Sequence, residues 1–443
     1  MNTEAPPVIP EAVNVCEAPL DRKPAKAPSL LYRALAGSLK FLWGMIFCQS
    51  LVGSILVVGW TYRLAQRQAL KQWWKRSRRP RQRESFADFL AADERTRVHR
   101  HWPNWFFRQN AREAFRRQPG MSWRRYAATC LAAPLQSLWE NFRTGLAGIF
   151  NTLVLTFPAC LFWWFGWYDG WNNSFNKGYE QAAVGPVISI LGIMFFIAAM
   201  FYVPLAQARQ AATGEWRSFY QFRLVWQIIR RRWLSCAGLA ALYSLLSVPL
   251  SILKVFPMYA PQTNSALEHL SDAAALRYLN HYFFWCAGAV LPAYVILRVV
   301  AARLYASGIL AAVQTGQVSP GALAQIEREA LERLDLLRVS PEPERHLFVR
   351  LIAWTGTLAG QITAAVVTFL LWFSFAAQIY VAEFLNYHTA QGWPNQPLVQ
   401  LPWFHYVPAR LKNPLAEVGL AVLVLFAVLT ILLLRRVAGR MRR

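Results

Sequence analysis

The sequence has few acidic residues and no closely paired cysteines. Only 23 of its 443 residues are Asp or Glu, and charged residues make up 16%, against about 25% in an average soluble domain. None of the six cysteines belongs to a Cys-x-x-Cys pair, so single buried thiols are the simplest interpretation. The seven histidines are scattered as well, and we predict no metal site.

Recognisable catalytic motifs are also missing. We find no HExxH, GxSxG or P-loop motif, and no GxGxxG in a strand-helix context, so we predict no catalytic residue and no cofactor. No Asp, Glu or His lies in the middle of an apolar run, where ion-driven transporters usually place ionisable groups. The nearest charged residues are expected at run ends, where their side chains can reach the interface. They are Lys254, Arg298, Arg303 and Glu417.

Long apolar runs are what the sequence has instead. Hydrophobic residues make up 55%, and seven runs reach the ~17–25 residues that a membrane-spanning helix needs. Lipid leaves the backbone no external hydrogen-bond partner, so such runs are expected to be helices. We predict an all-α, polytopic membrane helix bundle with six or seven transmembrane helices. The runs cover 41–62, 145–168, 187–206, 234–256, 283–306, 351–373 and 415–434.

The runs and the charges suggest a division of the chain. Residues 1–30 are rich in proline and lack the apolar core of a signal peptide, so we expect a disordered tail and no cleavable signal. The first run either spans the membrane or forms a re-entrant hairpin, with Gly53 and Gly59 allowing the bends. The expected parts are a tail at 1–40, a first membrane segment at 41–62, a basic cytoplasmic and interfacial region at 63–144, the bundle at 145–434 and a basic tail at 435–443.

The distribution of Lys and Arg predicts an orientation. The net charge is +24, and 35 Lys and Arg residues lie in alternate connections and the C-terminal tail, against four in the opposite connections. By the positive-inside rule the basic side faces the cytoplasm, and we expect a bacterial inner-membrane protein with a cytoplasmic C-terminus. The basic segments are 62–144, 207–233, 307–350 and 435–443, and the opposite ones are 169–186, 257–282 and 388–414.

An amphipathic stripe precedes the second, fourth and sixth runs. Helical spacing places the apolar residues of each stripe on one face. The first two stripes are flanked by Arg and Trp, as expected for helices in the headgroup plane. They are Leu131, Leu135, Leu138 and Phe142, and then Phe219, Phe222, Trp226, Ile229 and Trp233.

The third stripe lies in 320–338 and has a different opposite face. Its apolar residues are Leu323, Ile326, Ala330, Leu334 and Leu337. An acidic opposite face would be repelled by an anionic membrane surface, so we expect contact with protein. That contact is docking on the chain's own bundle, self-association or a partner protein, with own docking favoured by the short linkers. Ser319 and Pro320 are expected to start this helix, and the acidic residues are Glu327, Glu329, Glu332 and Asp335.

A polybasic stretch follows the first run. Its cations alternate with Trp73 and Trp74, and juxtamembrane Lys and Arg each gain about 1 kcal/mol near an anionic leaflet. We therefore predict contact with anionic lipids of the bilayer. We expect no nucleic acid, because no nucleic-acid module accompanies the charges. The predicted lipid contacts are Lys71, Lys75, Arg76, Arg78, Arg79, Arg81 and Arg83.

The connection 169–180 is polar and aromatic. Its amides and charges could bind a small ligand between helix ends, although Asn, Asp, Gly and Ser also form ordinary turns. The candidate ligand contacts are Asn172, Asn173, Asn176 and Lys177.

The segment 204–217 reads PLAQARQAATGEWR and ends the third run. Together with its surroundings, from Gly170 to Trp233, it resembles bacterial multi-pass membrane proteins classed under domains of unknown function. That resemblance supplies no active site. We expect Gly356 and Gly360 to allow close helix packing. The sequence favours a non-catalytic structural or accessory membrane protein, and the alternative is a transporter or channel for a small solute or lipid.

Overall fold

The computed structural model describes residues 30–78, 85–86, 89–90, 121–166, 184–338, 347–385 and 402, and every regular element in these ranges is a helix. The chain divides into two compact units, 1–41 and 42–443. Helix α1 begins in the first unit, and the second unit contains all the other elements.

The longer helices carry most of the core. They are α1 (Leu30–Phe47), α2 (Leu51–Arg76), α5 (Trp123–Phe165), α7 (Val184–Thr213), α9 (Trp233–Thr263), α11 (Asp272–Gln314) and α13 (Leu347–Leu385). Short elements connect or cap them: η4 (Trp216–Tyr220), α8 (Phe222–Arg231), α10 (Ser265–Glu268), η5 (Pro320–Ala322) and α12 (Gln325–Arg333).

Five of the described helices are long and apolar enough to cross a membrane: α5, α7, α9, α11 and α13. Five of the seven predicted apolar runs are thereby confirmed as long helices, and the structure is compatible with a multi-pass membrane protein. The seventh run, 415–434, and the tail 435–443 lie outside the described residues. Helices α5 and α11 each have 43 residues. A helix of that length measures about 65 Å, so each exceeds a ~30 Å hydrocarbon core.

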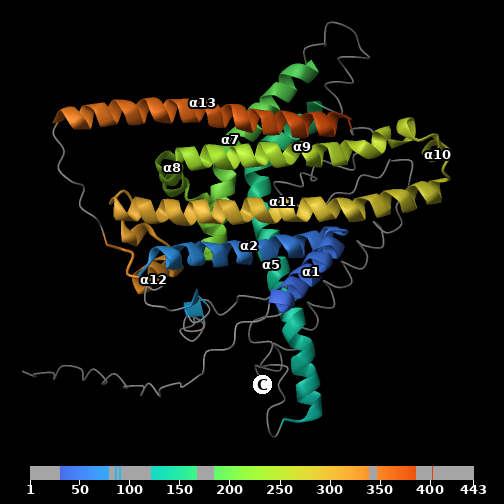
Figure 1. The fold of residues 1–443 in the computed structure, drawn as a ribbon, viewed down its shortest axis with the longest axis horizontal. Helices are drawn as coiled ribbons and strands as arrows, with labels where there is room; N and C mark the ends of the chain where they lie inside the picture. The colour runs from blue at the N-terminus through green and yellow to red at the C-terminus, as the bar shows by residue number, and fades with distance from the viewer. Residues whose placement is uncertain are drawn as a thin grey trace, which may run out of the picture. The chain divides into compact units, whose positions relative to one another are not determined.

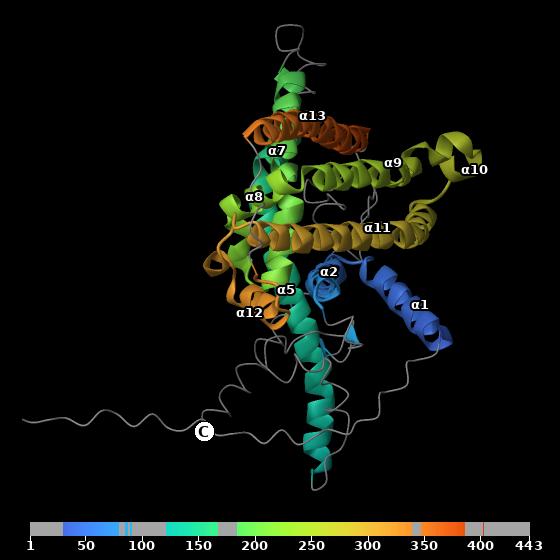
Figure 2. The same cartoon turned by 60° about the vertical axis from the view of Figure 1, so that its left-hand side comes forward.

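The long helices of the second unit lie in two directions. Helices α2, α9, α11 and α13 run side by side, whereas α5 and α7 run across them (Figures 1 and 2). The colours of Figure 1 show that α2 and α11 end on the side where α9 and α13 begin. The expected bundle is therefore a set of four side-by-side helices, with α2 and α11 running one way and α9 and α13 the other, and the pair α5 and α7 crosses this set.

The first predicted membrane segment is not one helix. Helix α1 ends at Phe47 and α2 begins at Leu51, with the Ser50 side chain accepting a hydrogen bond from the Gly53 amide at 3.0 Å. The bend is at 48–50 because that cap starts a new helix. The idea that Gly53 and Gly59 form bends is wrong, because both lie inside α2.

Gly59 and Gly145 have a different role, at the crossing of α2 and α5. A Cβ atom on Gly59 would lie 1.8 Å from the carbonyl oxygen of Asn141, and one on Gly145 would lie 2.0 Å from that of Ile55. No real Cβ atom approaches a backbone so closely, so the two helices can cross at this distance only through glycine.

The expected packing at Gly356 is not present. A Cβ atom on Gly356 would meet nothing within 4 Å, and one on Gly360 would meet only the Trp233 ring, at 3.2 Å. Helix α13 packs against α9 further along, where the rings of Trp372 and Tyr243 are 5.2 Å apart. Larger side chains therefore form this interface.

Aromatic rings from four helices meet in the middle of the core. Trp163 of α5 lies 4.9 Å from Phe196 of α7, measured between ring centroids. Phe196 lies 5.9 Å from Phe375 of α13, which lies 5.4 Å from Tyr243 of α9. All four side chains are buried, so the crossing pair and the side-by-side set share one core.

The two stripes predicted to lie in the headgroup plane have different outcomes. The stripe from Leu131 to Phe142 belongs to α5 and is continuous with the second run, so it is no separate helix. The second stripe includes a separate helix, α8. The predicted stripe is divided, because Phe222 and Trp226 are exposed whereas Phe219 and Ile229 are buried in the protein core. The residues of α8 that reach the core are Leu224, Val225, Ile228 and Ile229.

Candidate functional site

The C-terminal half of α7 is enclosed by other elements. Every residue from Tyr202 to Thr213 is buried, including Gln207, Arg209 and Gln210. Helices buried on all sides are usually apolar throughout, so three long polar side chains in this position need internal partners.

Arg209 is the centre of a polar group that joins α7, α11 and α12 to Gln221, an exposed residue between η4 and α8. Its Nη1 atom donates to the Tyr305 hydroxyl of α11 at 2.6 Å and to Glu327 Oε2 of α12 at 3.1 Å. Its Nε atom donates to Gln221 Oε1, before α8, at 2.8 Å. The Arg209 and Glu327 side chains are both 0% exposed. We call Arg209, Gln221, Tyr305 and Glu327 the Arg209 cluster.

Glu327 receives three kinds of donor within this cluster. Besides Arg209, the Tyr305 hydroxyl donates to Oε1, and the amide of Ala324 donates to Oε2 at 3.2 Å. Burial raises the pKa of the Glu327 carboxyl, and the charge of Arg209 and the donors offset only part of that rise. A carboxylate removed from water in this way depends on its partners for its stability.

The prediction that Glu327 lies on the exposed acidic face of 320–338 is wrong. Glu327 is the one acid of α12 that points inward. The predicted helix start also differs, because Ser319 and Pro320 open η5 and α12 begins only at Gln325. The available signal was Arg209, a cation that closely follows the third apolar run.

The third stripe packs on the chain itself. Leu323, Ala330 and Leu334 are buried in the main hydrophobic core, while Ile326 and Leu337 are half-buried. Glu329 accepts a hydrogen bond from Gln325 at 2.8 Å on the exposed side. This segment therefore closes over the end of α7 and covers the Arg209 cluster.

Further polar contacts link α5 to α7. Gln207 donates to the Thr152 hydroxyl at 2.6 Å, and Asn151 donates to Gln210 Oε1 at 3.1 Å. Tyr220 of η4 donates to Asn151 Oδ1 at 3.1 Å. These side chains satisfy one another, so they hold α5, α7 and η4 in register.

Two cations expected at run ends are buried instead. Arg298 is 6% exposed and Lys254 is 4% exposed. The guanidinium of Arg298 lies over the Tyr294 ring, 4.8 Å from its centroid. Arg303 is exposed and donates to Gln68 Oε1 at 3.1 Å, and Glu417 lies outside the described residues. The prediction that these cations reach the interface is therefore wrong for Arg298 and Lys254, because neighbouring helices cover them.

A small cavity lies beside Arg298, between α2, α7 and α11. Its volume is about 10 Å³, and Gln207, Tyr62 and Thr61 are among its lining residues. One water molecule occupies about that much space or more, so this cavity has no room for a solute.

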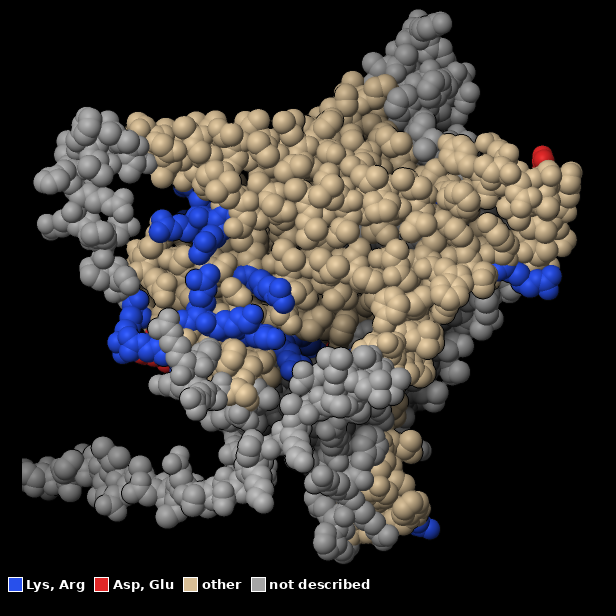
Figure 3. Space-filling model, in the orientation of Figure 1, with Lys and Arg blue, Asp and Glu red and all other residues tan. Residues whose placement is uncertain are grey.

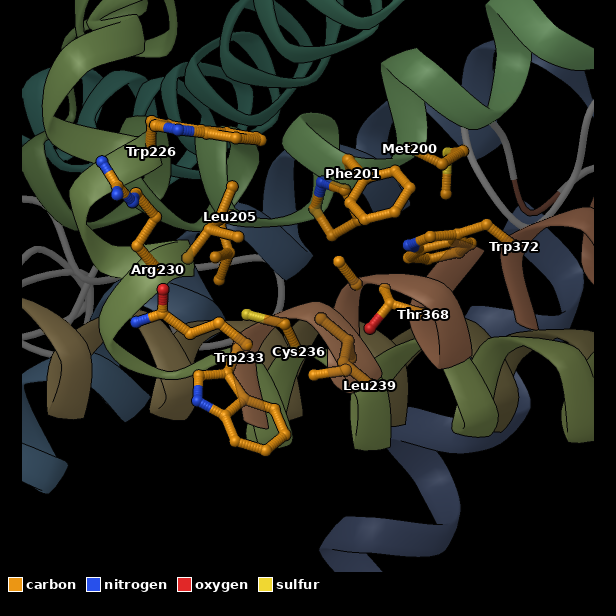
Figure 4. A pocket seen from close by; sticks show the side chains of 15 residues that line it. Met200, Phe201, Leu205, Trp226, Arg230, Trp233, Cys236, Leu239, Thr368 and Trp372 are labelled. Atoms are coloured by element: carbon orange, nitrogen blue, oxygen red, sulfur yellow. The ribbon is translucent and has the colours of Figure 1, made fainter. Parts of the chain in front are cut away.

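A larger pocket opens between α7, α8, α9 and α13, with a volume of about 200 Å³ (Figure 4). We call it the α13 pocket. Its lining is almost entirely apolar, with Arg230 and Trp226 at one end and Met200 and Trp372 at the other. It is larger than the cavity beside Arg298.

The polybasic stretch is only partly described. Lys75, Arg76 and Arg78 are exposed, whereas Arg79, Arg81 and Arg83 lie outside the described residues. Lys71 is half-buried, and burial lowers its pKa, helped by the nearby charges of Lys75, Arg67 and Arg303. Figure 3 shows Lys and Arg gathered around α8, α12 and the C-terminal end of α2.

Trp73 does not act as an interfacial anchor. Its side chain is 2% exposed and its Nε1 atom donates to the Ala306 carbonyl of α11 at 2.9 Å. The alternation of Trp and Lys suggests that Trp73 and the neighbouring cations face lipid together. In the helix, however, the Trp73 side chain points toward the protein, whereas Lys75 and Arg76 are exposed.

The candidate outer-loop contacts Asn172, Asn173, Asn176 and Lys177 lie outside the described residues. Within the described ranges, no group of three or more His, Cys, Asp and Glu side chains could hold a metal ion.

Comparisons of the chain with protein-family models, with curated proteins and with solved structures found no match. Any function proposed for the chain therefore rests on its own residues.

Proposed function

We propose that this chain is a multi-pass membrane protein with a structural or accessory role and no catalytic activity. The observation that carries the proposal is the closed Arg209 cluster, whose charges pair with each other at 3.1 Å and are completely buried. Such a cluster locks α7, α11 and α12 together. Neither described cavity offers a polar path for a solute, because one is too small and the other is apolar.

Transport of a solute or lipid is the alternative. Its support comes from Arg298 and Lys254, which are buried within long apolar helices. Ionisable residues inside a membrane are costly and often functional. The guanidinium of Arg298 lies against Tyr294, and the cavity that Arg298 lines has room for no more than about one water molecule, which favours the structural role.

A proton-flux measurement tests whether the chain transports protons, alone or coupled to a solute. We expect vesicles that contain the purified chain and an internal pH-sensitive dye to dissipate a pH gradient no faster than protein-free vesicles. Glu327→Gln serves as the diagnostic variant, because a proton path through the Arg209 cluster would need this carboxyl. Flux several-fold above the protein-free rate that Glu327→Gln abolishes, in a variant that remains folded, would establish transport and end the structural proposal.

We further propose that the basic end of the four side-by-side helices faces the cytoplasm of a bacterial inner membrane. The gathering of Lys and Arg around α8, α12 and the end of α2 supports this orientation. In the same proposal, Lys75, Arg76 and Arg78 contact anionic lipids. Because Leu323, Ala330 and Leu334 are buried against the chain itself, we favour docking of 320–338 on its own bundle over a foreign partner.

Cysteine labelling tests the orientation. In a background without native cysteines, we expect Glu268→Cys to react from outside the cell with an impermeant thiol reagent, because α10 joins α9 to α11 at the other end of these helices. Lys75→Cys is the matched exposed site at the basic end and should react only after the membrane is permeabilised. The reverse pattern would invert the orientation.

A further inference from the structure

The α13 pocket is hollow because α13 presents short side chains to it. Ala364, Ala365 and Thr368 line this wall, opposite Leu205 and Pro204 of α7. From Gln361 to Trp372 the wall covers eleven residue steps, or about 16 Å of helix. That length matches one leaflet of a ~30 Å hydrocarbon core.

The two ends of the α13 pocket differ in chemistry. Figure 4 shows the Arg230 guanidinium with the Trp226 and Trp233 rings at one end, and Met200 and Trp372 toward the other. Arg230 is exposed on α8, and no described residue forms an ion pair or hydrogen bond with it. The neighbouring Arg231 and Arg232 make this end strongly positive.

This combination fits a phospholipid better than a water-soluble ligand. Indole rings and cations favour the headgroup depth of a membrane, and a guanidinium binds phosphate oxygens through two parallel hydrogen bonds. The apolar wall offers a solute few hydrogen-bond partners. At about 200 Å³, the pocket is smaller than the ~300–1,000 Å³ of a drug-sized site, so it suits one chain and not a whole lipid.

We propose that the α13 pocket binds one acyl chain of an anionic phospholipid from the surrounding bilayer, with the lipid phosphate against Arg230. The second chain and the rest of the headgroup remain in the bilayer. A lipid bound in this way would fill the space between α7 and α13 that their side chains leave empty. The site is separate from the polybasic stretch, which attracts lipids only by charge, and it does not depend on the proposed structural role.

Native mass spectrometry of the full chain in mild detergent tests the headgroup. The probes are phosphatidylglycerol and phosphatidylcholine with the same chains. We expect phosphatidylglycerol to bind more tightly and Arg230→Gln to weaken its binding about tenfold, as loss of one charge-assisted contact implies. Arg231→Gln is the matched control, since Arg231 is exposed on the same helix and does not line the pocket.

Filling the pocket tests the acyl chain. We expect Thr368→Phe, and separately Ala365→Leu, to reduce binding of both lipids while apparent unfolding temperatures confirm that each variant is folded. Inorganic phosphate should not displace phosphatidylglycerol, because it lacks a chain. The proposal is overturned if Arg230→Gln and Arg231→Gln have equal effects, if both folded filling variants bind as the unaltered chain does, or if phosphate alone displaces the lipid.

Discussion

Replacement of Glu327 by Met is expected to lower the free energy of unfolding by about 3–5 kcal/mol, because it leaves the Arg209 guanidinium buried without its carboxylate. Arg209→Met should cost a similar amount, since it leaves Glu327 and Tyr305 without their shared donor. Unfolding of the purified chain in mixed micelles, followed by far-ultraviolet circular dichroism, measures both changes.

The double variant Arg209→Met/Glu327→Met is the sharper test. Replacing both members of a buried ion pair by apolar side chains is often neutral, so the double variant should recover most of the stability that either single change loses. Glu332→Met is the matched control, because Glu332 lies on the same helix and pairs with Arg328 at 3.8 Å on the surface. It should change stability by no more than about 0.5 kcal/mol. Equal effects of Glu327→Met and Glu332→Met would contradict the structural role of the Arg209 cluster.

Replacement of Gly59 by Ala is expected to have the second largest effect. The new Cβ atom would lie 1.8 Å from the carbonyl oxygen of Asn141, so α2 and α5 must separate. Overpacking of this kind costs about 1–3 kcal/mol, and Gly59→Leu should cost more because its longer side chain has no cavity to enter. The apparent unfolding temperature of the purified chain reports both changes.

Gly238→Ala provides the control for that crossing. Gly238 lies in α9, and a Cβ atom there would meet nothing within 4 Å, so the change should leave the unfolding temperature almost unaltered. The same intrinsic helix preference acts at both positions. If Gly59→Ala is as well tolerated as Gly238→Ala, the close crossing of α2 and α5 is not required for the fold.

The candidate site was harder to anticipate than the helices. The third apolar run, 187–206, is evident in the sequence and lies within α7. Arg209 and Glu327, however, are separated by 118 residues, and neither belongs to a local motif. The helical spacing of apolar residues in 320–338 correctly placed Leu323, Ala330 and Leu334 on one buried face. Glu327 was expected on the opposite, exposed face because charged side chains are ordinarily solvated. A charged side chain is buried only where a partner such as Arg209 pairs with it.

The sequence by itself predicted an all-α fold with seven long apolar runs, and five of these runs are long apolar helices in the described part of the chain, because such helices follow from the length and composition of local runs. It also indicated that 320–338 has an apolar face to cover. Tertiary structure alone decided the rest. The crossing at Gly59, the inward turn of Trp73 and the pairing of Arg209 with Glu327 all depend on which helices meet. Periodicity shows which residues share a face of one helix, whereas the partner that covers that face is set by contacts between residues far apart in the chain.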